Sequence, residues 1–208
     1  MGGDAMRDRT ERIRAHSVRL PGGYLPNPMA HMGNVRDANH YLKATGFLKE
    51  IGAETALDIG SYDGWLDFLL IGKGFKVEGV ELIPDLAAAA RRYADRNFIR
   101  YAVHEGYFAD LDLPGAYDAV MCFETLEHMP LDEVRVCAER MRDLAVKGVI
   151  VSLPDQDHRG NPQHLWTPDE DVIRDIWGVM PGFKLDFAPY PGTAIPGNYF
   201  ITHDGGAR

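Results

Sequence analysis

The stretch ETALDIGSYDG, residues 54–64, decides the predicted fold of this chain of 208 residues. It begins as an apolar strand and ends with Gly60 and Gly64, which permit a sharp turn and the close approach of a helix. Residues 65–70 then place apolar side chains at helical spacing. A helix start after a parallel strand presents free N–H groups and a positive dipole end, and such turns bind nucleotides. The stretch therefore predicts a strand, a turn and a helix with a nucleotide-type ligand.

An acidic residue in the next strand strengthens this prediction. Glu81 ends the apolar run of residues 75–80, about 20 residues beyond the glycine turn, where a carboxylate is placed to hold a ribose diol. The plainer interpretation is that Asp58 and Glu81 are ordinary carboxylates at strand ends. The two spacings together favour the interpretation as a ligand site.

Three stretches, in order, resemble the motifs of class I S-adenosylmethionine-dependent methyltransferases. They are ALDIGSYDG at residues 56–64, VEGVELIPD at 77–85 and YDAVMCFETLEHM at 117–129. The resemblance covers about half of the chain and implies S-adenosylmethionine as the cofactor. Tyr62 departs from the pattern, because the family usually has glycine there. We expect Tyr62 to narrow the approach to the methionine part of the cofactor, or to form a lid over it.

The resemblance also implies roles for individual residues around the cofactor. Asp58 would accept a hydrogen bond from the ammonium group, directly or through water, Glu81 would hold the ribose, and Leu82 would offer an apolar face to adenine. The family often has an acidic side chain where Tyr107 stands, so Asp110 is an alternative partner for the adenine edge. The further residues expected at the cofactor are Gly60, Ser61, Tyr62, Gly64, Tyr107, Phe108 and Glu124.

Glu124, Glu127 and His128 follow the fourth predicted strand, and their spacings place them on one side of a helical turn. Two carboxylates and an imidazole can bind a divalent ion. This E-x-x-E-H pattern resembles ubiquinone-biosynthesis O-methyltransferases and small-RNA 2′-O-methyltransferases, in which it supplies metal ligands. The resemblance implies His164 as a further ligand, with His158 as its substitute, and Mg²⁺ or another divalent ion as cofactor. Alternatively, the acids cap a helix and His128 acts as a base or a structural anchor.

The order of predicted elements indicates an α/β fold with a doubly wound, mostly parallel seven-stranded sheet and an antiparallel C-terminal hairpin, a Rossmann-like methyltransferase fold. The predicted strands are residues 55–59, 75–81, 98–103, 117–123, 146–153, 183–187 and 198–202. The predicted helices are residues 39–51, 63–71, 84–94, 131–144 and 168–177, with Thr167 as the cap of the last. We expect residues 1–37 to form an N-terminal arm and cap segment, and residues 38–204 to form the methyltransferase domain.

The composition is that of a globular protein with an excess of acidic residues. The 31 acidic and 22 basic residues give a net charge of −9, which argues against a long nucleic acid as substrate. No apolar run approaches the ~20 residues that cross a membrane, and the first residues lack the apolar core of a secretory signal. Cys122 and Cys137 are too few for a disulfide framework. We therefore expect a cytoplasmic protein with a small-molecule substrate, while no pattern specifies its oligomeric state.

These observations predict an S-adenosylmethionine-dependent methyltransferase that methylates a small molecule, in the first place at a hydroxyl oxygen. His128 is the first candidate for the base and His164 the second. The segments before the first strand would shape the acceptor pocket, and the candidates there are Tyr24, His31, Met32, His40 and Tyr41.

Three alternative functions stay open at this point. The first is a non-catalytic protein that binds the cofactor, and the second is a metal-dependent RNA 2′-O-methyltransferase. The third is an NAD-dependent dehydrogenase, although the glycine turn lacks the G-x-G-x-x-G fingerprint of that class.

Overall fold

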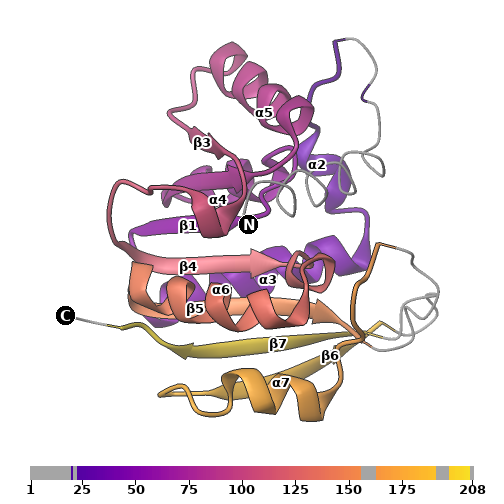
Figure 1. Ribbon diagram of the computed structural model, residues 1–208. Coiled ribbons are helices and arrows are strands. Elements are labelled where there is room, and N and C mark those ends of the chain that lie inside the picture. Colours follow the sequence, from indigo (N-terminus) through magenta and orange to yellow (C-terminus); the bar gives the residue numbers. More distant parts are fainter. Residues whose placement is uncertain (1–19, 21–22, 156–162, 191–196, 207–208) are drawn as a thin grey trace, which may run out of the picture.

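A computed structural model describes Leu20 and residues 23–155, 163–190 and 197–206 of the chain (Figure 1). The strands are β1 (Thr55–Ile59), β2 (Lys76–Glu81), β3 (Ala102–Glu105), β4 (Tyr117–Phe123), β5 (Ala145–Pro154), β6 (Lys184–Pro189) and β7 (Gly197–Asp204). The helices are α2 (Pro28–His31), α3 (Val35–Glu50), α4 (Trp65–Ile71), α5 (Pro84–Arg96), α6 (Leu131–Leu144) and α7 (Glu170–Trp177), with the short 3₁₀ turns η1 (Phe108–Asp110) and η2 (Leu126–His128). Of the expected arm and cap segment at residues 1–37, residues 1–19, 21 and 22 lie outside the described residues.

The described strands form one sheet in the order β3-β2-β1-β4-β5-β7-β6. Neighbouring strands from β3 to β5 are parallel, whereas β7 lies antiparallel between β5 and β6. This confirms the predicted doubly wound, mostly parallel seven-stranded sheet with an antiparallel C-terminal hairpin. The strand order reverses between β1 and β4, which is where open α/β sheets bind ligands at the carboxyl ends of their strands.

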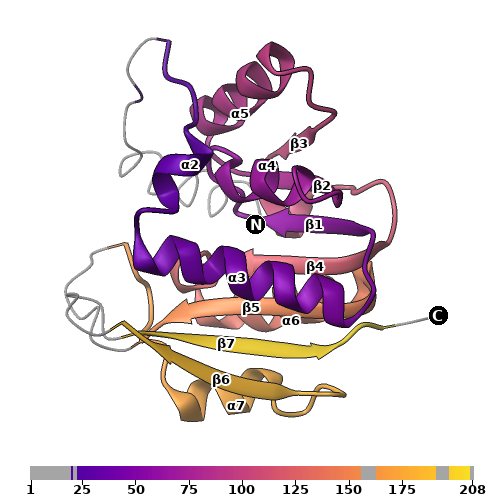
Figure 2. The ribbon, with the colours of Figure 1, turned by 180° about the vertical axis from the view of Figure 1, so that it is seen from behind.

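The sheet carries a hydrophobic core on each face. Successive residues of β4 alternate between them, so that Val120 and Cys122 pack with α6 and α7, whereas Ala119 and Met121 pack with α3 and α4. Figures 1 and 2 show α6 and α3 on opposite faces of the sheet. Burial on both faces explains why these strands read as nearly continuous apolar runs. Within the described residues, no helix combines the length and the apolar character needed to cross a membrane.

The predicted start of the third strand at residue 98 is wrong. The strand begins at Ala102, because α5 continues to Arg96 and the chain needs further residues to leave the helix. Phe98 takes a left-handed conformation with φ of 54° and is almost fully exposed. The backbone N–H of Ile99 then closes the helix end by donating to the carbonyl of Ala94.

Two helix starts also differ from the predictions. Asp169, rather than Thr167, caps α7, because its carboxylate accepts a hydrogen bond from the backbone N–H of Val172 at 2.8 Å. Helix α3 begins at Val35, with the side chain of Asn34 as its cap. The expected domain boundary after residue 37 therefore lies inside α3.

The turn after β1 packs directly on the turn after β4. Gly60 has a φ of 78°, and a Cβ atom there would lie 2.1 Å from Oγ1 of Thr125. The backbone N–H groups of Gly60 and Ser61 both donate to the carbonyl of Val80, at 2.8 and 3.0 Å. Residue 60 therefore has to be glycine for both conformational and steric reasons.

We expect Gly60→Ala to lower the free energy of unfolding by about 1–3 kcal/mol, because it adds both left-handed strain and a clash with Thr125. Urea denaturation measures the change. The matched control is Gly46→Ala in α3, where a Cβ atom meets nothing within 4 Å. That substitution should raise stability by about 0.5–1 kcal/mol, since alanine favours a helix. Equal effects of the two substitutions would contradict the role of Gly60.

Candidate active site

Glu81 holds the glycine turn against the end of β2. Its two carboxylate oxygens accept hydrogen bonds from the backbone N–H groups of Tyr62 and Ile83, each at 2.8 Å. Burial raises the pKa of Glu81 to about 7, against the lowering effect of these hydrogen bonds. A carboxylate has about four acceptor positions, so two remain for the hydroxyl groups of a ligand.

The other expected cofactor residues fall into two groups. Tyr62 has a φ of 55° and a side chain that is 41% exposed, and Gly64 is left-handed at the start of α4.

Tyr107 and Phe108, by contrast, are buried in the core on the α6 side. The Tyr107 hydroxyl donates to Glu133, and the Phe108 ring lies 4.9 Å from the guanidinium carbon of Arg140. Leu82 is partly buried and packs against the same core.

Asp58 is buried beside a second carboxyl group, that of Asp67 in α4. Burial raises the pKa of Asp58 to about 7 and holds the pKa of Asp67 well above its usual range. Asp67 was not among the predicted site residues. The signal that points to it is an acidic residue inside the otherwise apolar run of residues 65–71.

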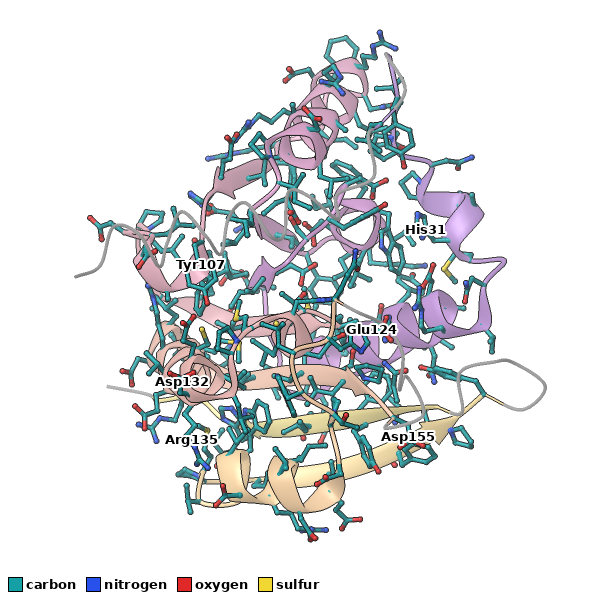
Figure 3. All side chains as sticks on the ribbon, turned by 45° about the vertical axis from the view of Figure 1, so that its right-hand side comes forward. His31, Tyr107, Glu124, Asp132, Arg135 and Asp155 are labelled. Carbon is teal, nitrogen blue, oxygen red and sulfur yellow. The ribbon has the colours of Figure 1, made fainter. Side chains whose placement is uncertain are left out.

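Glu124 lies beside α3 at the carboxyl edge of the sheet (Figure 3). Its side chain contacts residues from distant parts of the chain. Its backbone is left-handed, with a φ of 46°. One carboxylate oxygen pairs with the guanidinium of Arg36 at 2.9 Å, and the other accepts from the amide of Asn198 at 2.6 Å. These contacts join β4 to α3 and β7. The cluster of potential metal ligands among the described residues contains Glu127, His128 and His164 but not Glu124, which the sequence pattern had grouped with them.

His40 is part of the same polar network. Its Nε2 lies 3.2 Å from the side-chain amide nitrogen of Asn198 and 3.2 Å from Oγ of Ser152. Because the Asn198 amide nitrogen can only donate, Nε2 of His40 is the unprotonated nitrogen. Burial also lowers the pKa of His40. His40 is therefore neutral and links Ser152 to Asn198 by hydrogen bonds.

The remaining candidates before β1 pack around α4. The His31 ring stacks on Trp65 with centroids 4.6 Å apart, and its Nδ1 lies 2.8 Å from the Asp37 carboxylate. The hydroxyl of Tyr24 donates to the buried Asp63 at 2.6 Å. Met32 lies at the end of α2, and Tyr41 packs with the α3 and α4 core.

Glu127, His128 and His164 come together at the end of β4. One potential ligand atom from each lies within 4.8 Å of the others. Nδ1 of His128 is 3.0 Å from the carbonyl oxygen of Gln163, which can only accept a hydrogen bond. The neutral ring therefore carries its proton on Nδ1 and leaves Nε2 as a free base, 4.0 Å from a carboxylate oxygen of Glu127.

Of these three residues only Glu127 is buried, whereas His128 and His164 are partly exposed. Glu127 is only 1% exposed, and its Oε2 has no hydrogen-bond partner among the described residues. Burial, followed by the charge of Glu124, raises the pKa of Glu127, whereas burial lowers the pKa of His128. The donor set of one carboxylate and two imidazoles, with an unsatisfied buried oxygen, fits a divalent ion. The alternative ligand His158 lies outside the described residues.

The segment around His164 is docked on η2 by two hydrogen bonds. The backbone N–H of Leu165 donates to the carbonyl of Glu127 at 2.8 Å, and the Trp166 indole donates to the carbonyl of Leu126 at 3.1 Å. The rings of His128 and His164 are consequently 5.0 Å apart in an edge-to-face arrangement.

Comparison with known proteins identifies relatives of the central part of the chain. Residues 56–148 match the family model of a methyltransferase domain. The ubiquinone biosynthesis O-methyltransferase of Xanthomonas campestris pv. campestris is 32% identical over 90 residues, which cover 41% of this chain and 38% of that protein. The protein of the same name from Sodalis glossinidius is 31% identical over 119 residues, which cover 55% of this chain and 46% of that protein. The chain therefore spans less than half the length of these curated relatives.

A solved structure shows the same fold over nearly the whole chain. It is magnesium protoporphyrin IX methyltransferase from Synechocystis PCC 6803 with bound SAH, to which the chain is 18% identical. The two structures superpose with a TM-score of 0.66 and cover 97% of this chain and 95% of that one.

We expect Arg36→Met to lower the free energy of unfolding by about 1–3 kcal/mol, because it leaves the Glu124 carboxylate half-buried without its cation. The double variant Arg36→Met with Glu124→Gln should recover part of this loss in a urea-denaturation cycle. The control is Arg174→Met, which breaks an exposed pair with Glu170 and should cost less than about 0.5 kcal/mol. Additive effects at Arg36 and Glu124 would show that the two are not coupled.

Proposed function

We propose that this chain, a class I S-adenosylmethionine-dependent methyltransferase, methylates a hydroxyl group of a small molecule. The observation that carries the proposal is the tautomer of His128, whose Nδ1–H is committed to the Gln163 carbonyl while Nε2 remains basic. The names of the curated relatives, which are O-methyltransferases, support oxygen as the acceptor atom.

The residues around the glycine turn fit S-adenosylmethionine, which when bound supplies the methyl group from its sulfonium. Glu81 has acceptor positions left for the two ribose hydroxyl groups. At Gly60 and Gly64 any side chain would clash with a neighbouring side chain, so both positions of the turn require glycine. Asp58 supplies a carboxylate for the ammonium group, and the exposed ring of Tyr62 borders the turn.

His128 accepts the proton of the acceptor hydroxyl at Nε2 in this mechanism. Burial lowers its pKa, so the ring is neutral and able to accept a proton at neutral pH. A phenolic hydroxyl, with a pKa near 10, is far easier for an imidazole to deprotonate than an aliphatic one. We therefore favour a phenol or catechol as the acceptor.

A second arrangement is supported by the cluster of Glu127, His128 and His164. These three residues would hold a divalent ion, which lowers the pKa of a hydroxyl group and fixes its position. Nε2 of His128 would then be a ligand rather than a base.

We expect Glu81→Ala to weaken the binding of S-adenosylhomocysteine at least tenfold, because the ribose loses a charge-assisted acceptor. Calorimetric titration measures the dissociation constant. The control is Glu105→Ala at the end of β3, an exposed carboxylate paired with Arg91, which should leave the affinity unchanged. Equal affinities of Glu81→Ala and the wild type would refute the cofactor assignment.

We expect His128→Gln to lower kcat by about 10²–10⁴-fold while S-adenosylhomocysteine still binds normally. Transfer of a tritiated methyl group to a panel of phenols and catechols measures the rate. In the wild type, the rate should rise with pH through a pKa below 6.5, since the neutral ring is the active form. The control is His104→Gln on β3, which should behave as wild type.

Other outcomes of this assay separate the alternatives. Activity that a chelator removes and Mn²⁺ restores would assign His128 to a metal site instead of the base. Tight binding of S-adenosylhomocysteine without transfer to any acceptor would favour a non-catalytic cofactor-binding protein.

A further inference from the structure

Phe98 stands at a backbone position that normally belongs to glycine. It follows helix α5 with a φ of 54°. The helix ends in a Schellman motif, in which the backbone N–H of Ile99 donates to the carbonyl of Ala94 at 2.9 Å. The backbone N–H of Phe98 donates to the carbonyl of Asp95 at 3.3 Å. The left-handed residue of this motif is usually glycine, since a side chain there is strained.

The Phe98 side chain gives the fold nothing in return for this strain. The apolar contact that closes the motif is made by the next residue, Ile99, which packs against Phe68, Ala90 and Ala94. The Phe98 side chain itself is 98% exposed. Strained residues of this kind occur mostly at functional sites. The position of Phe98 therefore points to a contact outside the protein.

Four cations flank the exposed ring. Arg96 and Arg100 lie two residues to either side of Phe98, and Lys73 and Lys76 lie in and just after the turn between α4 and β2. All four are exposed, and within the described part of the chain none of them forms an ion pair. The exposed Asp95 offsets one of these charges. The region is thus positive, although the whole chain has a net charge of −9.

The two turns that carry these residues lie side by side. Ile71, at the end of α4, and Ile99, after α5, pack against the same cluster. The helices lead into β2 and β3, which are parallel neighbours, so both turns lie at the amino edge of the sheet. We call the surface that these turns form the basic tip. It consists of Lys73, Lys76, Arg96, Phe98 and Arg100.

The basic tip lies at the edge of the sheet opposite to the candidate active site. The glycine turn and Glu81 follow the carboxyl ends of β1 and β2, whereas the tip precedes β2 and β3. Figure 1 shows α5 and β3 at one end of the molecule, with β6 and α7 at the other. A partner bound to the tip therefore leaves the carboxyl edge of the sheet open.

We propose that the basic tip docks the protein on an anionic membrane surface, with the Phe98 ring inserted among the lipid headgroups. Because the ring is almost fully exposed, no groove of this protein encloses it, and the partner has to supply apolar surroundings. A lipid interface supplies them together with negative charge. Each cation near such a surface strengthens binding about fivefold. The attachment is peripheral, and it does not depend on the proposed function.

Flotation of the full chain with lipid vesicles tests the proposal. The wild type should float with vesicles of phosphatidylcholine and phosphatidylserine, but not with vesicles of phosphatidylcholine alone. Raising the salt from about 0.1 M to about 1 M should release it, because the Debye length falls from ~10 Å to ~3 Å. A wild type that ignores both kinds of vesicle would overturn the proposal.

The variant Phe98→Gly separates a docking role from a structural one. It should bind the anionic vesicles at least about fivefold more weakly, because the inserted ring is gone. Its unfolding equilibrium constant in urea should nevertheless fall about threefold or more, since glycine adopts the left-handed backbone without strain. The control is Val179→Gly after α7, an exposed apolar residue at the opposite end of the molecule, which should bind as the wild type does. Unchanged binding of Phe98→Gly would contradict the proposal.

A pair of charge variants tests whether the location of the cations matters. Arg96→Gln with Arg100→Gln should weaken vesicle binding about tenfold or more. The control removes two positive charges away from the tip, by Arg135→Gln with Arg174→Gln, and should have a smaller effect. Equal losses would show that only net charge acts and would overturn the proposal. Binding of polyuridylate or polyglutamate through the tip, without binding of vesicles, would replace the membrane by an acidic polymer as the partner.

Discussion

The contact between Gly60 and Thr125 joins the two halves of the site. Gly60 follows β1, which carries Asp58, and Thr125 precedes η2, which carries Glu127 and His128. With no side chain between them, the two turns pack at van der Waals distance and cannot move independently. The separation between the candidate cofactor residues and the candidate base is therefore set by the sheet itself.

Buried acids dominate the electrostatics around the glycine turn, where the candidate cofactor residues lie. Asp58, Asp63, Asp67 and Glu81 all have a pKa raised by burial. Such a site is unfavourable for many negative charges at once and favourable for a ligand that brings positive charge. On the proposed function, S-adenosylmethionine carries a sulfonium and an ammonium, whereas the product has lost the sulfonium charge. The product is therefore held less strongly, which favours its exchange.

The sequence predicted those parts of the structure that depend on neighbours along the chain. The glycine turn and Glu81 belong to local patterns, and the mostly parallel sheet with its antiparallel hairpin was predicted from the alternation of strands and helices. The third strand was placed too early because Phe98 is apolar, although it is almost fully exposed where the chain leaves α5. Apolar character alone does not distinguish a strand from the end of a helix.

The parts that could not be predicted depend on contacts between distant segments. Asp67 pairs with Tyr101, and Glu124 pairs with Arg36 and Asn198, across separations in sequence that no local pattern encodes. Glu124 shows the consequence most clearly. The sequence pattern grouped it only with Glu127 and His128, whereas its side chain also binds residues of α3 and β7. An acidic residue inside an apolar helix was the one local sign of such a network.

The position of β7 bears on the order in which the site is completed. β7 is the last strand of the described chain, yet it lies inside the sheet, between β5 and β6. A chain that emerges from the ribosome can assemble β1 to β5, and with them the glycine turn, before Asn198 has been synthesised. The left-handed backbone of Glu124 gains its second side-chain partner only when this final strand inserts. The glycine turn can thus form early in translation, whereas the contact between Glu124 and Asn198 forms last.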